Sequence, residues 1–154
     1  MKIAIASDKD GTPLKLYLVE ELKRLGHKVD NLEVANSEFS DYPDIACMLG
    51  RAVALTPYDV GILTSGTGVG MSSAASKVSG IYSELCTSVT AAEHARVSQK
   101  ANVLCLSAWL TSREIALAIA VKFIDTPRQI NGPTGEENNK VLEEWIKARK
   151  RVSL

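Results

Sequence analysis

The residues best suited to chemistry lie in one stretch, residues 58–80, which reads YDVGILTSGTGVGMSSAASKVSG. Its apolar run over 60–63 leads directly into SGTGVG at 65–70, followed by small residues that favour a helix. This order predicts a buried strand, a tight glycine turn and a helix N-terminus. Glycine lets a backbone approach a ligand closely, and the first N–H groups of a helix attract negative charge. The turn therefore suits a phosphate, a carboxylate or the oxyanion of an enediolate.

Two familiar glycine motifs are absent from this stretch. The GxGxxG spacing of dinucleotide-binding turns does not occur, and the P-loop pattern GxxxxGK[ST] does not fit. A GxGxG turn after a strand also occurs where it serves only the packing of the strand against a helix. Both interpretations, an anion or carbonyl site and a purely structural turn, stay open on this motif alone.

Short apolar runs alternate with helical patterns along the chain. We expect strands at 2–7, 27–32, 60–63, 81–86 and 102–107. Besides the helix after the glycine turn, we expect helices at 12–25, 45–55, 89–99, 111–124 and 136–151. Asp44, or a residue just before it, is the expected cap of the second of these helices. Apolar strands that alternate with helices predict an α/β fold with a parallel sheet covered on both faces.

The predicted sheet fixes where a ligand should bind, because ligands of such sheets lie beyond the carboxyl ends of the strands. Those ends are residues 8–10, the glycine turn at 65–70, residues 87–88 and Ser107. The final predicted helix has no strand after it, and its apolar face includes Trp145. We interpret that face as a contact with a second subunit, with coverage of the chain's own sheet as the alternative.

Composition excludes several classes of function. A chain of 154 residues fits one domain over 1–154, and its formal net charge of zero gives no reason to expect nucleic acid or an anionic membrane as partner. No apolar run approaches the roughly 20 residues of a membrane span, and the N-terminal run passes straight into charge, as in a strand and unlike a signal peptide. Cys47, Cys86 and Cys105 are scattered, as in a cytoplasmic protein with reduced thiols. They lack metal-ligand spacing, and with two histidines we expect no zinc site.

Four segments together resemble a known family. They are SDKDGTPLK after the first strand, SDYPD before the second helix, GILTSGTGVGM…AASKVSGI around the glycine turn, and ANVLCLS in the last strand. Over nearly its full length the chain resembles the type B ribose-5-phosphate isomerases and the galactose-6-phosphate isomerase subunits. The resemblance implies a three-layer α/β/α fold with a five-stranded parallel, Rossmann-like sheet and an extra C-terminal helix. It also implies homodimers or homotetramers with interfacial active sites, and no organic or metal cofactor.

The reaction implied by the resemblance is aldose–ketose isomerisation through a cis-enediol(ate). A base removes the proton next to the carbonyl, and backbone amides of the glycine turn stabilise the charge on oxygen. Ser65 stands where most members carry the cysteine that acts as this base, and a serine hydroxyl is too weak an acid to replace it. Met71 occupies the position of a glutamate that some relatives use. Thr67 and the glycines are retained, so we expect the oxyanion site to persist.

Further positions depart from the family pattern. Lys9 replaces a histidine, and Ser98 and Gln99 replace the ring-opening histidine and the asparagine after it. Trp109 stands where an arginine is expected, and residues 131–134 replace a Gly-Gly-Arg-His stretch. The loss of these phosphate ligands predicts a substrate other than standard ribose 5-phosphate.

The candidate catalytic residues are Ser65, Thr67 and Asp10, with Asp10 as the substitute base and a turn or helix cap as its alternative role. Lys9 is expected to bind an anionic group or to act as an acid at the carbonyl oxygen, with an exposed turn lysine as the alternative. The candidate substrate-binding residues are Asp8, Lys9, Gly66, Gly68, Val69, Gly70, Ser98, Gln99 and Arg128.

Three other side chains leave two interpretations each. His94 shares a helix face with Ser98 and either supplies the lost imidazole or lies on the surface. Glu84 is either a buried carboxylate with a raised pKa or an edge residue. Cys86 either packs in the core, as we expect, or acts as a nucleophile. Two functions follow: an isomerase of a sugar or sugar phosphate, or a non-catalytic sugar-binding relative or partner subunit of a heteromeric isomerase.

Overall fold

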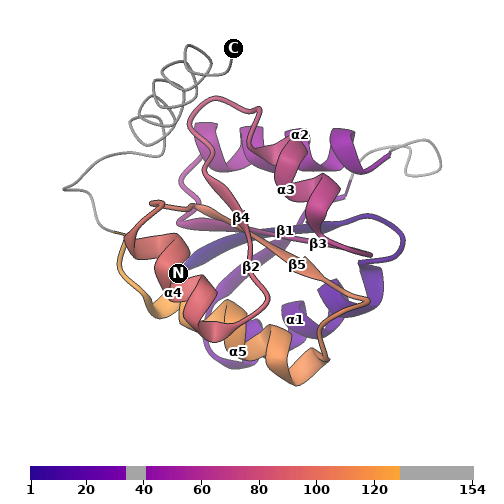
Figure 1. Cartoon of the computed structure of the whole chain (residues 1–154), viewed down its shortest axis with the longest axis vertical. Coiled ribbons are helices and arrows are strands. Elements are labelled where there is room, and N and C mark those ends of the chain that lie inside the picture. Colours follow the sequence, from indigo (N-terminus) through magenta and orange to yellow (C-terminus); the bar gives the residue numbers. More distant parts are fainter. Residues whose placement is uncertain (34–40, 129–154) are drawn as a thin grey trace, which may run out of the picture.

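The computed structural model describes residues 1–33 and 41–128 (Figure 1). These residues form a five-stranded sheet in the order β2-β1-β3-β5-β4, and every neighbouring pair is parallel. The strands are β1 (Lys2–Ser7), β2 (Lys28–Asn31), β3 (Val60–Ser65), β4 (Ser83–Leu85) and β5 (Val103–Ser107). The predicted α/β class with a five-stranded parallel sheet is confirmed.

Helices cover both faces of the sheet (Figure 1). They are α1 (Thr12–Arg24), α2 (Tyr42–Leu55), α3 (Val69–Ala75), α4 (Val89–Val97) and α5 (Arg113–Asp125). The pair α2 and α3 packs on one face, and α1, α4 and α5 pack on the other. The predicted three-layer arrangement is confirmed, whereas the predicted helix at 136–151 lies outside the described residues.

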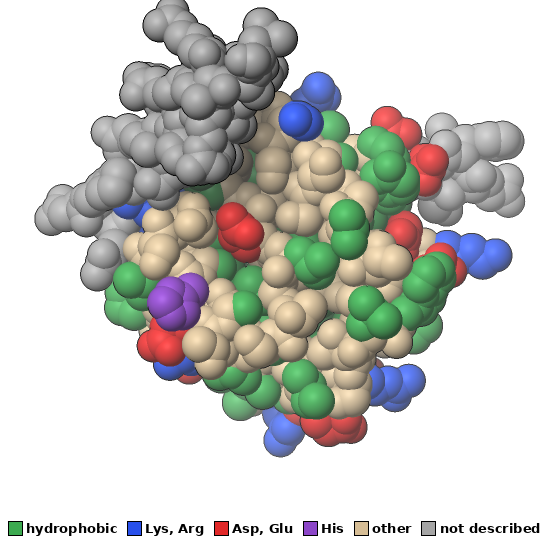
Figure 2. All heavy atoms as spheres, in the orientation of Figure 1, with side chains coloured by type: hydrophobic (Ala, Val, Ile, Leu, Met, Phe, Trp, Pro, Cys, Tyr) green, Lys and Arg blue, Asp and Glu red, His purple; other side chains and the backbone are tan. Residues whose placement is uncertain are grey.

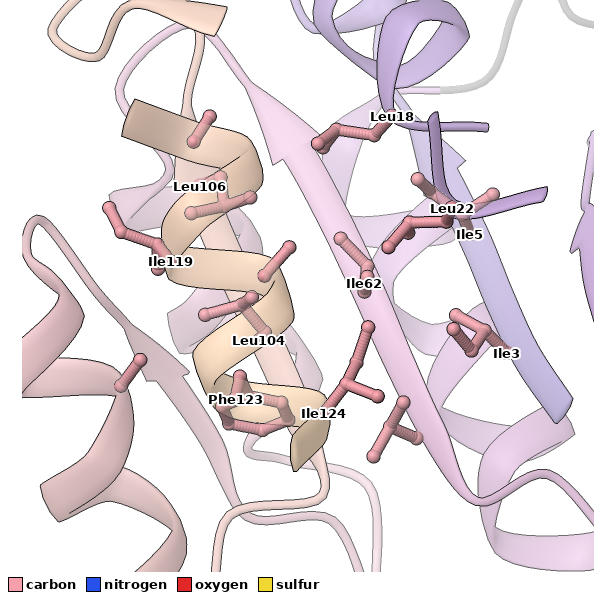
Figure 3. Packing of buried hydrophobic residues seen from close by; sticks show 14 of the residues in the cluster. Ile3, Ile5, Leu18, Leu22, Ile62, Leu104, Leu106, Ile119, Phe123 and Ile124 are labelled. Atoms are coloured by element: carbon pink, nitrogen blue, oxygen red, sulfur yellow. The ribbon is translucent and has the colours of Figure 1, made fainter. Parts of the chain in front are cut away.

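Alternating strand residues supply the two halves of the core. Side chains of one set face α1, α4 and α5 (Figure 3); among them are Ile3, Ile5, Ile62, Leu104 and Leu106. Side chains of the other set face α2 and α3; among them are Ala4, Ala6, Leu63, Val103 and Cys105. Since successive strand residues point to opposite faces and both faces are covered, each strand reads as a continuous apolar run.

Two predicted boundaries are wrong at the second helix and the fourth strand. Helix α2 begins at Tyr42, earlier than predicted, because the side chain of Asp41 caps it by accepting a hydrogen bond from the Tyr42 N–H at 2.7 Å. Strand β4 is shorter than predicted. The Tyr82 N–H donates to the Asn102 side chain at 2.9 Å, so the ladder with β5 begins at Ser83.

Two further corrections concern α4 and α5, the helices on the opposite face of the sheet. Helix α4 ends at Val97 and not at residue 99, and Lys100 then adopts a positive φ of 53°, which a helix does not allow. Helix α5 starts at Arg113 because the Ser112 hydroxyl accepts a hydrogen bond from the Ile115 N–H. Within the described ranges, no helix has the length and apolar character that crossing a bilayer requires.

Candidate active site

The loop between β1 and α1 lies directly on the end of β3. A Cβ atom added to Gly11 would lie 2.1 Å from the Thr64 carbonyl oxygen, so the close approach requires glycine. The Thr64 hydroxyl also donates a hydrogen bond to the Gly11 carbonyl at 2.9 Å. This contact holds residues 8–10 beside the glycine turn at 65–70, on the right-hand side of Figure 1, where the carboxyl ends of β1 and β3 meet.

Hydrogen bonds within the loop fix Asp8. Its Oδ1 accepts the Gly11 N–H at 2.8 Å, and the Thr12 hydroxyl donates to the Asp8 carbonyl oxygen at 2.9 Å. These hydrogen bonds orient Asp8, whose side chain is half-buried, whereas Lys9 and Asp10 are exposed. The predicted site residues of this loop therefore lie together at the carboxyl edge of the sheet.

The carboxyl of Asp8 lies in an acidic neighbourhood. Burial raises its pKa above the ordinary value, and the negative charges of Asp10 and Asp41 raise the pKa further, against the lowering effect of the Gly11 N–H. Asp41, the cap of α2, thereby joins the site. A cap at or just before Asp44 was expected, but a place for Asp41 in the site was not. The signal was available, because SDYPD places an aspartate just before a Tyr-Pro pair that starts a helix.

The glycine turn is closed by Ser65. Its hydroxyl oxygen accepts the Gly68 N–H at 2.9 Å, and Gly68 has the left-handed φ of 79° that favours glycine. The first hydrogen bond across the start of α3 runs from the Ser72 N–H to the Gly68 carbonyl. The N–H groups of Val69 and Gly70 therefore have no acceptor within the helix, although the Val69 N–H donates a long hydrogen bond of 3.4 Å to the Thr67 hydroxyl. Those N–H groups are suited to stabilising a carbonyl oxygen as it becomes negative.

The end of β5 holds the turn from the other side. The Ser107 hydroxyl donates to the Gly66 carbonyl at 2.7 Å, and the Trp109 N–H donates to the same oxygen at 3.1 Å. The Ala108 N–H donates to the Ser65 carbonyl at 2.8 Å. The turn is therefore a fixed element built jointly by β3 and β5.

Two aromatic rings contact the turn at its two ends. A Cβ on Gly66 would lie 2.7 Å from the indole ring of Trp109, and a Cβ on Gly70 would lie 2.7 Å from the Tyr42 ring. Both side chains are nevertheless exposed, Trp109 to 66% and Tyr42 to 40%. Hydrophobic side chains gather on the corresponding right-hand side of Figure 2. Tyr42, which follows the Asp41 cap, was not among the site residues predicted from the sequence.

The remaining candidate binding residues lie elsewhere in the chain. Ser98 is the C-cap that follows α4, and Gln99 comes next, so both precede the amino end of β5. Ser65, in contrast, pairs with Ser107 at the carboxyl end of β5. The Arg128 side chain donates a hydrogen bond to the Lys100 carbonyl at 2.8 Å and contacts the Tyr82 ring. Both partners lie just before a strand, at the amino edge of the sheet. One chain therefore does not bring Ser98, Gln99 or Arg128 to its own glycine turn.

Two cavities, of about 400 and 420 Å³, border these residues. Glu84 and Gln99 line both, and Ser98 and His94 line the second. Glu84 lies on the edge strand β4, and its partial burial raises its pKa. Cys86 packs in the core as predicted, where burial raises its pKa to about 12. No cluster of His, Cys, Asp and Glu suited to a metal ion occurs within residues 1–33 and 41–128.

Comparison with known proteins places this chain in a family. The sequence model of a family described as Ribose/Galactose Isomerase matches residues 3–143. Ribose-5-phosphate isomerase B of Escherichia coli is 37% identical over 124 residues, which cover 80% of this chain and 80% of that protein. The structure of a ribose 5-phosphate isomerase from Thermotoga maritima is 35% identical, with a TM-score of 0.81 over 93% of this chain and 97% of the other.

A third relative carries a ligand. The structure of ribose-5-phosphate isomerase B from Mycoplasma genitalium, with bound ribulose-5-phosphate, is 33% identical to this chain. Its TM-score is 0.73 over 97% of this chain and 96% of the other.

Proposed function

Because the chain belongs to the ribose/galactose isomerase family, we propose that it interconverts an aldose and a ketose through a cis-enediol(ate) intermediate. The observation that carries this proposal is the contact of Gly11 with Thr64, which holds two aspartates beside a turn with N–H groups free of intrahelical bonds. The name of the Escherichia coli relative and the ligand of the Mycoplasma genitalium relative support a sugar or sugar phosphate as substrate.

The proposed reaction needs one base and one oxyanion site. A carboxylate takes the proton from the carbon next to the carbonyl, and the electrons of that C–H bond form the C=C bond of the enediol(ate). The carbonyl oxygen gains the negative charge, which the N–H groups of Val69 and Gly70 and the Thr67 hydroxyl stabilise. The proton of the hydroxyl on the neighbouring carbon moves to the former carbonyl oxygen, so that the neighbouring carbon becomes the new carbonyl. The same carboxyl returns its proton to the former carbonyl carbon, and no cofactor is consumed.

Asp10 is the proposed base, and Asp8 holds a sugar hydroxyl. Ser65 is unsuited to the role because its hydroxyl is a very weak acid and its oxygen already accepts the Gly68 N–H. The raised pKa of Asp8 makes that carboxyl the second candidate base, since a stronger base removes a carbon-bound proton more readily. The variants D10N and D8N separate the two roles: loss of the base abolishes turnover, whereas loss of a hydroxyl contact mainly raises KM.

A second copy of the chain completes the proposed site. Ser98, Gln99 and Arg128 lie far along the chain's own sheet from its glycine turn, and they reach a substrate only if the partner of a homodimer or homotetramer presents them. Co-refolding of D10N with a Q99A variant tests this. Random pairing in a dimer leaves about a quarter of sites with both residues intact, so activity returns in the mixture. No recovery, with dimers still formed, contradicts a shared site.

Proton exchange in D₂O tests the reaction itself. Purified protein is mixed with aldoses, ketoses and their phosphates, and proton NMR follows loss of the signal at the carbon next to the carbonyl. Exchange above the protein-free rate is expected and should disappear in D10N. Silence across the panel would contradict an isomerase.

The free thiols of the three cysteines also support a reducing, cytoplasmic location as part of this proposal.

A further inference from the structure

Trp109 lies against the glycine turn in a fixed position although its side chain is largely exposed. Its N–H donates to the Gly66 carbonyl at 3.1 Å, and its indole contacts the Cα side of the same residue. A tryptophan that is 66% exposed leaves much apolar surface in water, which proteins usually avoid for so large a ring. An exposed aromatic ring held against an oxyanion site is a surface on which a ligand can stack.

The opposite end of the turn carries a second ring. Tyr42 contacts Gly70, and its N–H is held by the Asp41 carboxylate at 2.7 Å. A ligand whose carbonyl oxygen reaches the N–H groups between Gly66 and Gly70 therefore has an aromatic side chain at either end of the turn. The C–H faces of a sugar suit such rings, because an aromatic face is electron-rich and attracts polarised C–H groups.

The acidic side chains that the chain's own β1–α1 loop and the start of α2 bring to the site disfavour a phosphate beside them, whereas Arg128 of a second copy would add one positive charge. Asp10 and Asp41 both act electrostatically on Asp8, so three carboxylates share this neighbourhood. Carboxylates accept hydrogen bonds from sugar hydroxyls but repel a phosphate dianion. Lys9 is the cation of the β1–α1 loop, whereas Lys15 on α1 is buried and pairs with Glu33 at 3.9 Å. Position 109, where the resemblance implies an arginine, supplies no charge.

We propose that Trp109 determines substrate specificity by stacking on the sugar, and that the substrate is an unphosphorylated aldose or ketose. This inference rests on the proposed isomerase function for its kinetic test and names the substrate class of the same site. Lys9 then donates a hydrogen bond to the carbonyl oxygen or to a hydroxyl of the sugar. The indole offers apolar contact where an arginine would offer a positive charge. The C–H face of a neutral sugar gains from such contact, whereas a phosphate group does not.

Kinetics on matched substrate pairs test the inference. Ribose is compared with ribose 5-phosphate, and galactose with galactose 6-phosphate, in the wild type and in the W109A, W109F and W109R variants. We expect the neutral sugar to be preferred, W109A to lower kcat/KM for it by about tenfold through KM, and W109F to retain most of the activity. W109R should shift the preference towards the phosphate by about tenfold or more. The neighbouring exposed residue gives the control L110A, which should change nothing.

Fluorescence supplies a test that does not need turnover. The chain has two tryptophans, so the W145F variant reports on Trp109 alone. Neutral sugar should change its emission, with saturation, more strongly than the matched phosphate does. A phosphate preference in the wild type, or no effect of W109A on either substrate, overturns the inference. A sugar-dependent emission change without any proton exchange would support the inference while contradicting the isomerase function.

Discussion

The Ser65 hydroxyl oxygen accepts a hydrogen bond from the backbone N–H of Gly68 at 2.9 Å, and both residues are buried. This bond closes the glycine turn and sets the direction in which α3 leaves the sheet. Ser65 stands where the resemblance implies a cysteine base. Its role here is structural, because its hydroxyl oxygen is a good acceptor for the Gly68 N–H. The turn can keep its shape although the catalytic thiol is absent.

Removal of this hydroxyl should destabilise the protein. S65A leaves the buried Gly68 N–H without its acceptor, which costs about 1–3 kcal/mol in the free energy of unfolding. Urea denaturation monitored by circular dichroism measures the difference. The exposed neighbour T67A, whose hydroxyl makes only a 3.4 Å contact, is the control and should stay within about 0.5 kcal/mol of wild type. Equal stability of S65A and wild type would show that the turn does not depend on this bond.

Restoration of a thiol should increase the rate of proton abstraction. A cysteine ionises near pH 8.5, so S65C provides a base at the turn and should raise the D₂O exchange rate by about tenfold or more. The rise should follow pH as the thiol ionises, and iodoacetamide should abolish it. An unchanged rate in a folded S65C protein would show that the substrate carbon does not approach this position.

Substitution of Gly11 should disrupt the contact between the two halves of the site. The added Cβ of G11A would overlap the Thr64 carbonyl oxygen, and because that atom belongs to the backbone the loop must move. We expect a loss of about 3 kcal/mol or more in unfolding free energy, with loss of activity. G26A is the matched control: Gly26 has a φ of +90° but nothing within 4 Å, so only the backbone strain of about 1 kcal/mol applies. Similar losses in the two variants would contradict the close contact.

The raised pKa of Asp8 predicts a pH-dependent effect on stability. A carboxyl whose pKa is higher in the folded than in the unfolded protein favours folding while it is protonated, and this contribution is lost as pH rises through the raised value. D8N keeps an oxygen for the Gly11 N–H but has no charge. It should therefore melt at a higher temperature than wild type at pH 7, and the gap should shrink as pH falls towards 3.8. The exposed E20Q is the control, and a lower melting temperature of D8N at pH 7 would refute the prediction.

Burial of two cysteines predicts their slow reaction with thiol reagents. The pKa of both Cys86 and Cys105 is raised to about 12 by burial, so neither forms appreciable thiolate at pH 8. Cys47 is partly exposed. Titration with a chromogenic disulfide should therefore detect one fast thiol in the native protein and three in denaturant. The C47S variant should lose the fast phase; fast labelling of Cys86 would contradict its place in the core.

The elements of the fold could be predicted from local sequence, but their ends could not. The apolar runs of β3 and β5 identify buried strands because both faces of the sheet are covered. The start of α2 depends on which aspartate accepts the Tyr42 N–H, and the start of β4 depends on the distant Asn102 side chain. Competing caps and side chains far along the chain decide such ends, and periodicity does not encode them.

Residue types at fixed spacing were enough to predict the parallel α/β sheet, the glycine turn at the end of β3 and the family. Which side chains lie in contact depends on how distant segments pack, and the sequence did not reveal those contacts. Gly11 contacts Thr64 across 53 residues, the rings of Trp109 and Tyr42 contact the two ends of the turn, and Asp41 adds its charge to that of Asp8. Ser98 lies far from the turn for the same reason. Packing brings distant segments together at one edge of a sheet, and spacing along a chain cannot specify which of them touch.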